Sequence, residues 1–76
     1  MQPATPPWIL QARIELGNRI RDARLAADLT QEKLALLAGV DRTTLQNTEL
    51  GKRDPKFSQL LRLARALNLP ARDFMP

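Results

Sequence analysis

The sequence predicts a single, all-helical domain. Leucine and alanine dominate a chain of 76 residues in which 43% are apolar, while β-branched and aromatic residues are few. Leu and Ala favour helices, whereas strands favour β-branched and aromatic side chains. The apolar residues also recur at helical spacing, in segments separated by Gly, Asp, Asn or Pro. A chain of this length is near the lower limit for one self-sufficient core.

The Pro-rich start of the chain, residues 1–7, is expected to be a flexible arm, with the domain spanning residues 8–76. The first helix should begin near Trp8 and end near Asp28, a short polar residue that tolerates the left-handed conformation at a helix end. Its predicted core-facing stripe consists of Trp8, Ala12, Leu16, Ile20, Ala23 and Ala27.

Two short helices follow, joined by a tight turn. Thr30 is expected to cap the second helix, and Gly39 to end it. Asp41 is expected to cap a third helix over residues 42–49, which stops at Gly51. This layout is typical of a helix-turn-helix, which presents its second helix to the major groove of DNA.

The last third of the chain predicts one more helix and a final turn. Asp54-Pro55 indicates a turn, after which Ser58 is expected to cap the fourth helix. The predicted stripe of this helix consists of Leu60, Leu61, Ala64 and Leu67. Asn68 is expected to close the helix, before a final turn that starts at Pro70.

One face of the third helix is predicted to point outward and to carry no carboxylate. At about 100° per residue, Leu45, Thr48 and Glu49 share one side, and the large apolar Leu45 makes that side the inner one. Thr44 lies at the margin. The outer side carries side chains of the types that bind base edges, namely Arg42, Thr43, Gln46 and Asn47. The alternative is an ordinary solvated face, although such faces more typically interleave Glu and Lys.

Charge and composition narrow the classes of function. Twelve Lys and Arg against eight Asp and Glu give a net charge of +4, which suits a nucleic-acid partner. The chain has no Cys and no His, which excludes disulfides, Cys/His zinc sites and imidazole catalysis. Ser58, the only serine, has no base to activate it, so we expect no enzyme activity, no catalytic residue, no metal and no cofactor. No segment reads as a membrane span or a signal peptide, so we expect a cytoplasmic location and no membrane partner.

Five blocks of the chain resemble the phage repressor/Cro-type helix-turn-helix family, also called XRE. They are Leu16-Gly17-Asn18-Arg19-Ile20-Arg21, Leu29-Thr30-Gln31-Glu32-Lys33-Leu34-Ala35, Ala38-Gly39-Val40, Glu49-Leu50-Gly51-Lys52-Arg53-Asp54-Pro55 and Leu63-Ala64-Arg65-Ala66-Leu67. The resemblance covers about residues 16–75. It implies a compact five-helix domain of a bacterial or phage, nucleoid-associated repressor that binds operator DNA as a dimer.

The resemblance also implies roles for individual residues. It assigns base reading to Arg42, Thr43 and Asn47, to which the outward face adds Gln46. It assigns phosphate contacts to Gln31, Thr44, Lys52 and Arg53. Arg24 and Glu49 match an ion pair of the family, and we interpret this pair as structural because Glu49 lies on the inner side. Asp41 is interpreted as a helix cap, because a carboxylate beside phosphate is unfavourable.

The chain departs from the family pattern in three places. Thr48 stands where the family usually has Ile or Leu, so either the third helix packs less tightly or the Thr48 hydroxyl bonds to a preceding carbonyl. Leucines occupy positions that are usually charged, and residues 8–15 extend the first helix upstream of the family's start. The leucines are Leu36, Leu37 and Leu50, and the extension contributes Trp8, Ile9, Leu10 and Ile14.

The leucines and the extension together suggest a hypothesis about packing. If the first two helices run antiparallel across their tight turn, the extension lies near Leu36 and Leu37 and covers them, within one chain or across a dimer. The alternative is that these are scattered surface leucines.

Together these patterns predict a sequence-specific, DNA-binding transcriptional regulator that reads the major groove with its third helix. A homodimer is expected, through Trp8, Ile9, Leu10, Leu36, Leu37 or Leu50. The alternative is an antitoxin-like or coactivator-like protein-interaction module on the same fold, in which the apolar residues bind a protein partner.

Overall fold

The computed structural model describes residues 4–75, which form four α-helices and one 3₁₀ turn. The elements are α1 (Pro7–Ala26), α2 (Gln31–Ala38), α3 (Arg42–Glu49), α4 (Phe57–Ala66) and the 3₁₀ turn η1 (Ala71–Phe74). The all-helical architecture is confirmed for this part of the chain, but the expected count of five helices is wrong. The last element is a single turn because it has only four residues between Pro70 and Met75, too few for an α-helix. None of the described helices is long and apolar enough to cross a membrane.

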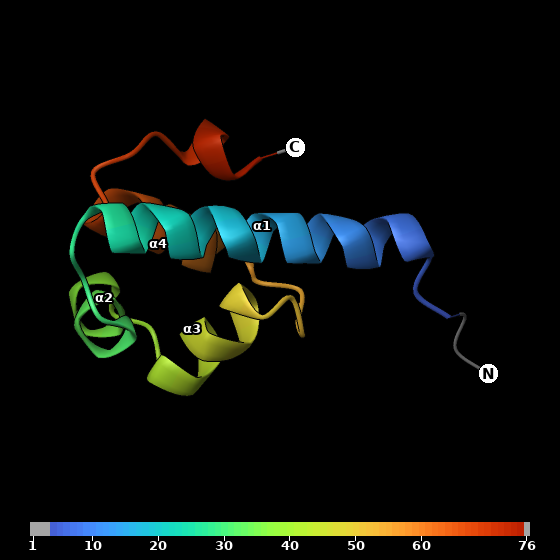
Figure 1. Cartoon of the computed structure of the whole chain (residues 1–76), viewed down its shortest axis with the longest axis horizontal. Coiled ribbons are helices and arrows are strands. Elements are labelled where there is room, and N and C mark those ends of the chain that lie inside the picture. Colours follow the sequence, from blue (N-terminus) through green and yellow to red (C-terminus); the bar gives the residue numbers. More distant parts are fainter. Residues whose placement is uncertain (1–3, 76) are drawn as a thin grey trace.

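α1 forms the long axis of the molecule, and the other elements pack along its second half (Figure 1). α3 packs on α1 and α2, α2 also packs on α4, and η1 packs on α4 and α1. In Figure 1, α2 and α3 lie below α1 while η1 lies above it. The first half of α1 extends beyond the other helices toward the N-terminus.

The core lies where the four helices meet. Its fully buried large side chains are Ile20, Leu34, Leu45 and Leu63, one from each helix. The predicted stripe of α1 is correct only in its middle, since Trp8 is 72% exposed and Ala27 is also exposed. The N-terminal half of α1, which carries Trp8, extends beyond the other helices (Figure 1), and Ala27 follows the last residue of α1, Ala26. In α4, Leu60 and Ala64 are buried as expected, but the assignment of Leu61 to the core was wrong, because Leu61 is 42% exposed and Leu63 is buried instead.

The predicted ends of the short helices are largely confirmed. The Thr30 hydroxyl accepts a hydrogen bond from the Lys33 amide at 3.0 Å, which makes Thr30 the N-cap of α2. Gly39 ends α2 in the left-handed region at φ 69°, where a residue with a Cβ would be strained. Asp28 and Asn68 likewise have positive φ, at 57° and 58°, just beyond α1 and α4.

Two boundaries differ from expectation. Pro7, assigned to the arm, is the first residue of α1, a position that proline's fixed φ suits. Residues 1–3 of the expected arm lie outside the described residues. Ser58 does not cap α4, because the helix already begins at Phe57 and Ser58 lies exposed in its first turn. The Lys56 amide instead donates to the Gln59 side-chain oxygen at 3.2 Å.

The hypothesis that the start of α1 covers the leucines of α2 within one chain is wrong. Leu36 and Leu37 remain 74% and 53% exposed. At about 1.5 Å per residue, α1 is ~30 Å long and α2 only ~12 Å. Because α2 lies beside the C-terminal end of α1, it cannot reach the other end (Figure 1).

Candidate nucleic-acid interface

The outer face of α3 is set by how the helix is anchored. Leu45 is fully buried, and Thr48 and Glu49 are only 3% and 5% exposed, so this side is fixed against the core. The opposite side points away from the protein and carries Arg42, Thr43 and Gln46, which are exposed, and Asn47, which is half-buried. The structure therefore brings the four sequence-predicted base-reading residues together on one surface.

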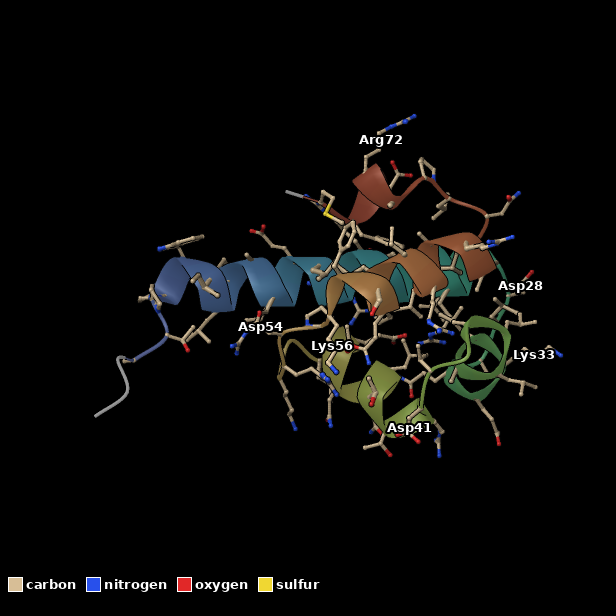
Figure 2. The ribbon with its side chains drawn as sticks, turned by 180° about the vertical axis from the view of Figure 1, so that it is seen from behind. Asp28, Lys33, Asp41, Asp54, Lys56 and Arg72 are labelled. Carbon is tan, nitrogen blue, oxygen red and sulfur yellow. The ribbon has the colours of Figure 1, made fainter. Side chains whose placement is uncertain are left out.

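Asp41 fixes the start of α3. Its carboxylate accepts hydrogen bonds from the Thr43 and Thr44 amides at 3.0 and 3.3 Å, so the predicted cap is confirmed. Figure 2 shows Asp41 at the end of α3 that lies away from α1. The negative charge of the carboxylate also interacts favourably with the positive end of the helix dipole, which stabilises this end of α3.

A buried ion pair anchors the other end of α3. Arg24 donates to both carboxylate oxygens of Glu49, from Nε at 2.8 Å and from Nη2 at 3.0 Å, and donates from Nη1 to the Leu29 carbonyl at 2.9 Å. The hydrogen bonds to Glu49 raise the pKa of the Arg24 guanidinium above its usual value, and the negative charge of Glu49 adds to this effect while burial opposes it. Arg is already charged at any physiological pH, so Arg24 carries its positive charge there. The pair ties α1 to the end of α3.

Gln31 joins this ion pair from the start of α2. Its side-chain nitrogen donates to Glu49 Oε1 at 3.1 Å, and the residue is half-buried. A carboxamide nitrogen carries two hydrogens, so one remains for a further acceptor. Glu49 thus holds Gln31 in place at the N-terminus of α2.

The hydroxyl groups of α3 have distinct partners. The Thr48 hydroxyl donates to the Thr44 carbonyl at 2.8 Å, so the second of the two alternatives for Thr48 is the one observed. The Thr44 hydroxyl oxygen accepts from Arg53 Nη1 at 3.3 Å. Because this oxygen acts as acceptor there, its own hydrogen remains available to donate. Arg53 is half-buried, with its Nε buried and unpartnered among the described residues.

The loop between α3 and α4 is held against both helices. Gly51 begins it in the left-handed region at φ 74°, and the Lys52 amide donates to the Asn47 carbonyl at 3.0 Å. The Lys52 side chain is exposed. Asp54, which Figure 2 shows in the loop beside α1, pairs with Arg13 at 3.3 and 3.4 Å. The loop that carries Lys52 is therefore held by a backbone hydrogen bond to Asn47 and by the ion pair between Asp54 and Arg13.

Comparison with known proteins identifies the family. Residues 20–74 match the helix-turn-helix family HTH_3. The chain belongs to this family. The HTH_3 protein is a DNA-binding transcription regulator of the XRE type, as the resemblance implied.

The HTH_3 protein is similar to curated regulators. It is 36% identical over 58 residues to an uncharacterized HTH-type transcriptional regulator of Archaeoglobus fulgidus, a match that covers 76% of this chain and 82% of the relative. It is 35% identical over 60 residues to the uncharacterized HTH-type transcriptional regulator RghRB of Bacillus subtilis, over 78% of this chain. This second match spans only 43% of that relative's length.

Two solved structures have the same fold as the HTH_3 protein. The restriction-modification controller protein C.AhdI from Aeromonas hydrophila superposes with a TM-score of 0.83 at 35% identity, over 86% of this chain and 98% of that one. The hypothetical transcription factor NHTF from Neisseria superposes with a TM-score of 0.82 at 28% identity, over 100% of this chain and 87% of that one.

Sequence reasoning missed the ion pair that positions the loop of this HTH_3 protein. Arg13 and Asp54 are 41 positions apart, so no local spacing connects them. It also missed the bond between Thr44 and Arg53, which joins two residues that were assigned separate phosphate contacts. Predicting a long-range pair of this kind requires the path of the chain in space, and the periodicity of the sequence does not supply that path.

Proposed function

We propose that the HTH_3 protein binds double-stranded operator DNA as a homodimer, with α3 of each copy in the major groove. One observation carries this proposal: four hydrogen-bonding side chains lie on the outer face of α3 while Leu45 beneath them is fully buried. A helix with its side chains is about 10–12 Å wide and fits a major groove of about 12 Å. Operator DNA lies in the cytoplasm, so the protein works there and associates with the nucleoid.

Base reading is assigned to the outer face of α3. Arg42 suits a guanine, to which a guanidinium can donate two hydrogen bonds, and Asn47 or Gln46 suits an adenine. The Thr43 methyl suits contact with a thymine methyl. These side chains hold and read a duplex without changing covalent bonds, so the proposed activity includes no catalytic step.

Phosphate contacts are assigned to the residues around α3. Gln31 retains a free amide hydrogen at the N-terminus of α2, where the helix dipole favours an anion. Thr44 retains its hydroxyl hydrogen, and the Arg53 guanidinium beside it adds positive charge. Lys52 extends from the loop after α3. Such contacts fix the register of the protein on DNA but do not specify sequence.

Arg42→Ala and Asn47→Ala are each expected to relax sequence preference at one or two base positions. Losing a bidentate contact to a base costs about 1–3 kcal/mol of discrimination. The measurement is selection of bound duplexes from a randomised pool by the wild-type protein and each variant. Each variant should lose preference at its own positions and keep the rest. If both variants select the wild-type sequence unchanged, α3 does not read bases through these residues.

Lys52→Ala is expected to weaken binding to all sequences alike. Removing one phosphate contact should flatten the slope of log affinity against log salt by about 0.9. Fluorescence anisotropy with one selected and one scrambled duplex, across a salt series, measures both effects. Lys33→Ala is the matched control, because Lys33 is also an exposed lysine but lies on α2 and carries no assigned contact. An equal effect of the two substitutions would mean that only overall charge matters.

A protein-interaction module is the second candidate function, favoured by the exposure of Leu36 and Leu37 on α2. An antitoxin-like or coactivator-like protein would use these leucines on a protein partner. A mobility-shift assay with the DNA upstream of the chain's own reading frame distinguishes the DNA-binding regulator from the protein-interaction module. Salt-sensitive binding that requires Arg42 supports the regulator, whereas no shift at any salt concentration supports the interaction module.

A further inference from the structure

We propose that Arg13 acts on DNA binding through Asp54, by holding the Asp54 carboxylate against α1 and neutralising its charge. Asp54 directly follows Lys52 and Arg53, the proposed phosphate contacts, in the loop after α3. Arg13 is thus a positioning residue that removes a negative charge from the surface that DNA approaches. This inference deepens the proposed function and rests on it.

The loop between α3 and α4 is basic apart from Asp54. Residues 50–56 carry Lys52, Arg53 and Lys56 and a single carboxylate. The Asp54 side chain is 73% exposed, so burial does not remove its charge from the surface. The Cα atoms of Lys52 and Asp54 are at most about 7 Å apart, because each residue of an extended chain spans at most about 3.6 Å. The screening length at physiological salt is about 8 Å, so an unpaired Asp54 would weaken the attraction of this loop for phosphate.

Two hydrogen bonds join Arg13 to Asp54, which lies in the loop beside α1 (Figure 2). Arg13 Nε donates to Oδ1 at 3.3 Å and Nη2 donates to Oδ2 at 3.4 Å, so the guanidinium grips both carboxylate oxygens. The Arg13 side chain is only 19% exposed, which means that packing restricts where the guanidinium can lie. A pair with one exposed partner contributes little to stability, so its main consequence is for the charge of the surface.

The same stretch of α1 also touches the start of the loop. A Cβ at Gly51 would lie 2.9 Å from Ile14 Cα, so the loop backbone lies directly against α1 there. Gly51 and Asp54 stand on either side of the two proposed phosphate contacts. Because the contact at Gly51 does not involve Arg13, replacing Arg13 should change the charge of the loop more than its path.

The other carboxylates of this region also have partners. Residues 41–56 contain three carboxylates, of which Asp41 accepts hydrogen bonds from amides of α3 and Glu49 is paired with Arg24. The third is Asp54, whose partner is Arg13. Without Arg13, Asp54 would keep no hydrogen-bond partner among residues 4–75, and its charge would be the uncompensated one beside α3.

Arg13 lies outside the part of the chain that matches the family, which is residues 20–74. It belongs to the extension of α1, residues 8–15. The extension does not cover Leu36 and Leu37, which remain exposed, but it does contact the loop of the proposed phosphate contacts. The ion pair therefore gives this extension a part in DNA binding that the family match does not contain.

The first test measures DNA affinity at low salt by fluorescence anisotropy, with one selected and one scrambled duplex. Arg13→Gln should weaken binding to both duplexes by about three-fold or more, because Asp54 is left unpaired beside the phosphate contacts. The loss should shrink as salt rises, since ions screen the freed charge. Arg21→Gln is the matched control, because Arg21 is also an arginine of α1 but pairs with Asp22 of its own helix, at 3.7 Å. Equal losses for the two variants, or no loss for Arg13→Gln, would overturn the proposal.

The second test is the rescue of Arg13→Gln by Asp54→Asn. Asparagine has nearly the shape of aspartate but carries no charge, so the double variant should regain wild-type affinity to within about two-fold. Asp54→Asn alone should bind at least as tightly as the wild type. Arg13→Lys keeps the positive charge and should lose less affinity than Arg13→Gln. A double variant as weak as Arg13→Gln would mean that Arg13 contacts DNA itself or supports the fold, and either result overturns the proposal.

The wild-type protein distinguishes the failure of this inference from the failure of the proposed function. If the wild type selects and binds no duplex, the proposed function is wrong and this inference falls with it. If the wild type binds and Lys52→Ala weakens binding as expected, while Arg13→Gln has no effect, the function stands and only this inference is wrong.

Discussion

Replacing Glu49 with alanine is expected to lower the free energy of unfolding by about 3–5 kcal/mol, the cost of removing one partner of a buried ion pair. The Glu49 side chain is 3% exposed and accepts hydrogen bonds from both Arg24 and Gln31. Arg24, only 11% exposed, would be left as a buried charge without its partner. Urea denaturation followed by circular dichroism measures the loss.

Glu15→Ala is the matched control for this prediction. Glu15 is also a helical glutamate, but it is exposed, and its side chain accepts only a long 3.5 Å hydrogen bond from Gln11. Its removal should change stability by less than about 0.5 kcal/mol. If Glu49→Ala kept wild-type stability and lost DNA affinity instead, Glu49 would belong to the DNA-binding surface and its structural assignment would be wrong.

Features that depend on a few neighbouring residues could be predicted from the sequence. The caps Thr30 and Asp41 and the left-handed Gly39 follow from local chemistry, and the structure has them where expected. The inner side of α3 also follows from one residue, because Leu45 is its only large apolar side chain. A short amphipathic helix has one apolar anchor and therefore one possible orientation.

Features that depend on the path of the chain could not be predicted. Leu61 and Leu63 are both compatible with a helical stripe, and only the packing of α2 and η1 on α4 decides which one is buried. The expectation that the start of α1 lies beside α2 assumed that a tight turn makes two helices antiparallel along their whole length. The lengths of the two helices make this impossible.

The features of the candidate site likewise divide into those that could be predicted and those that could not. The residue types on the outer face of α3 could be read from the periodicity, whereas the bonds that hold the surrounding residues could not. Gln31 bonds to Glu49 across 18 positions, and Arg53 to Thr44 across 9. Residues that were assigned phosphate contacts one by one are therefore linked to the buried ion pair and to α3, so a substitution at one of them also alters its neighbours.

Gly17→Ala is expected to destabilise the protein by about 1–3 kcal/mol, although the same change in an ordinary helix stabilises it by about 1 kcal/mol. Gly17 is buried in α1, where α1 crosses the end of α3. A Cβ at this position would lie 2.6 Å from the Thr48 carbonyl oxygen and would also clash with the Glu49 carbonyl. Both neighbours are backbone atoms, so the helices have to separate to admit the methyl group.

Thermal and urea denaturation of Gly17→Ala and Asn18→Ala tests this prediction by the sign of the change in the free energy of unfolding. Asn18 is the next residue of α1 and is exposed, so its replacement by alanine should raise stability by a few tenths of a kcal/mol through helix propensity. A gain in stability for both variants would show that α1 and α3 are not in close contact at Gly17. If the loss occurs, DNA affinity should also fall under conditions where the variant is folded, because the crossing at Gly17 sets the direction in which α3 presents Arg42 and Asn47.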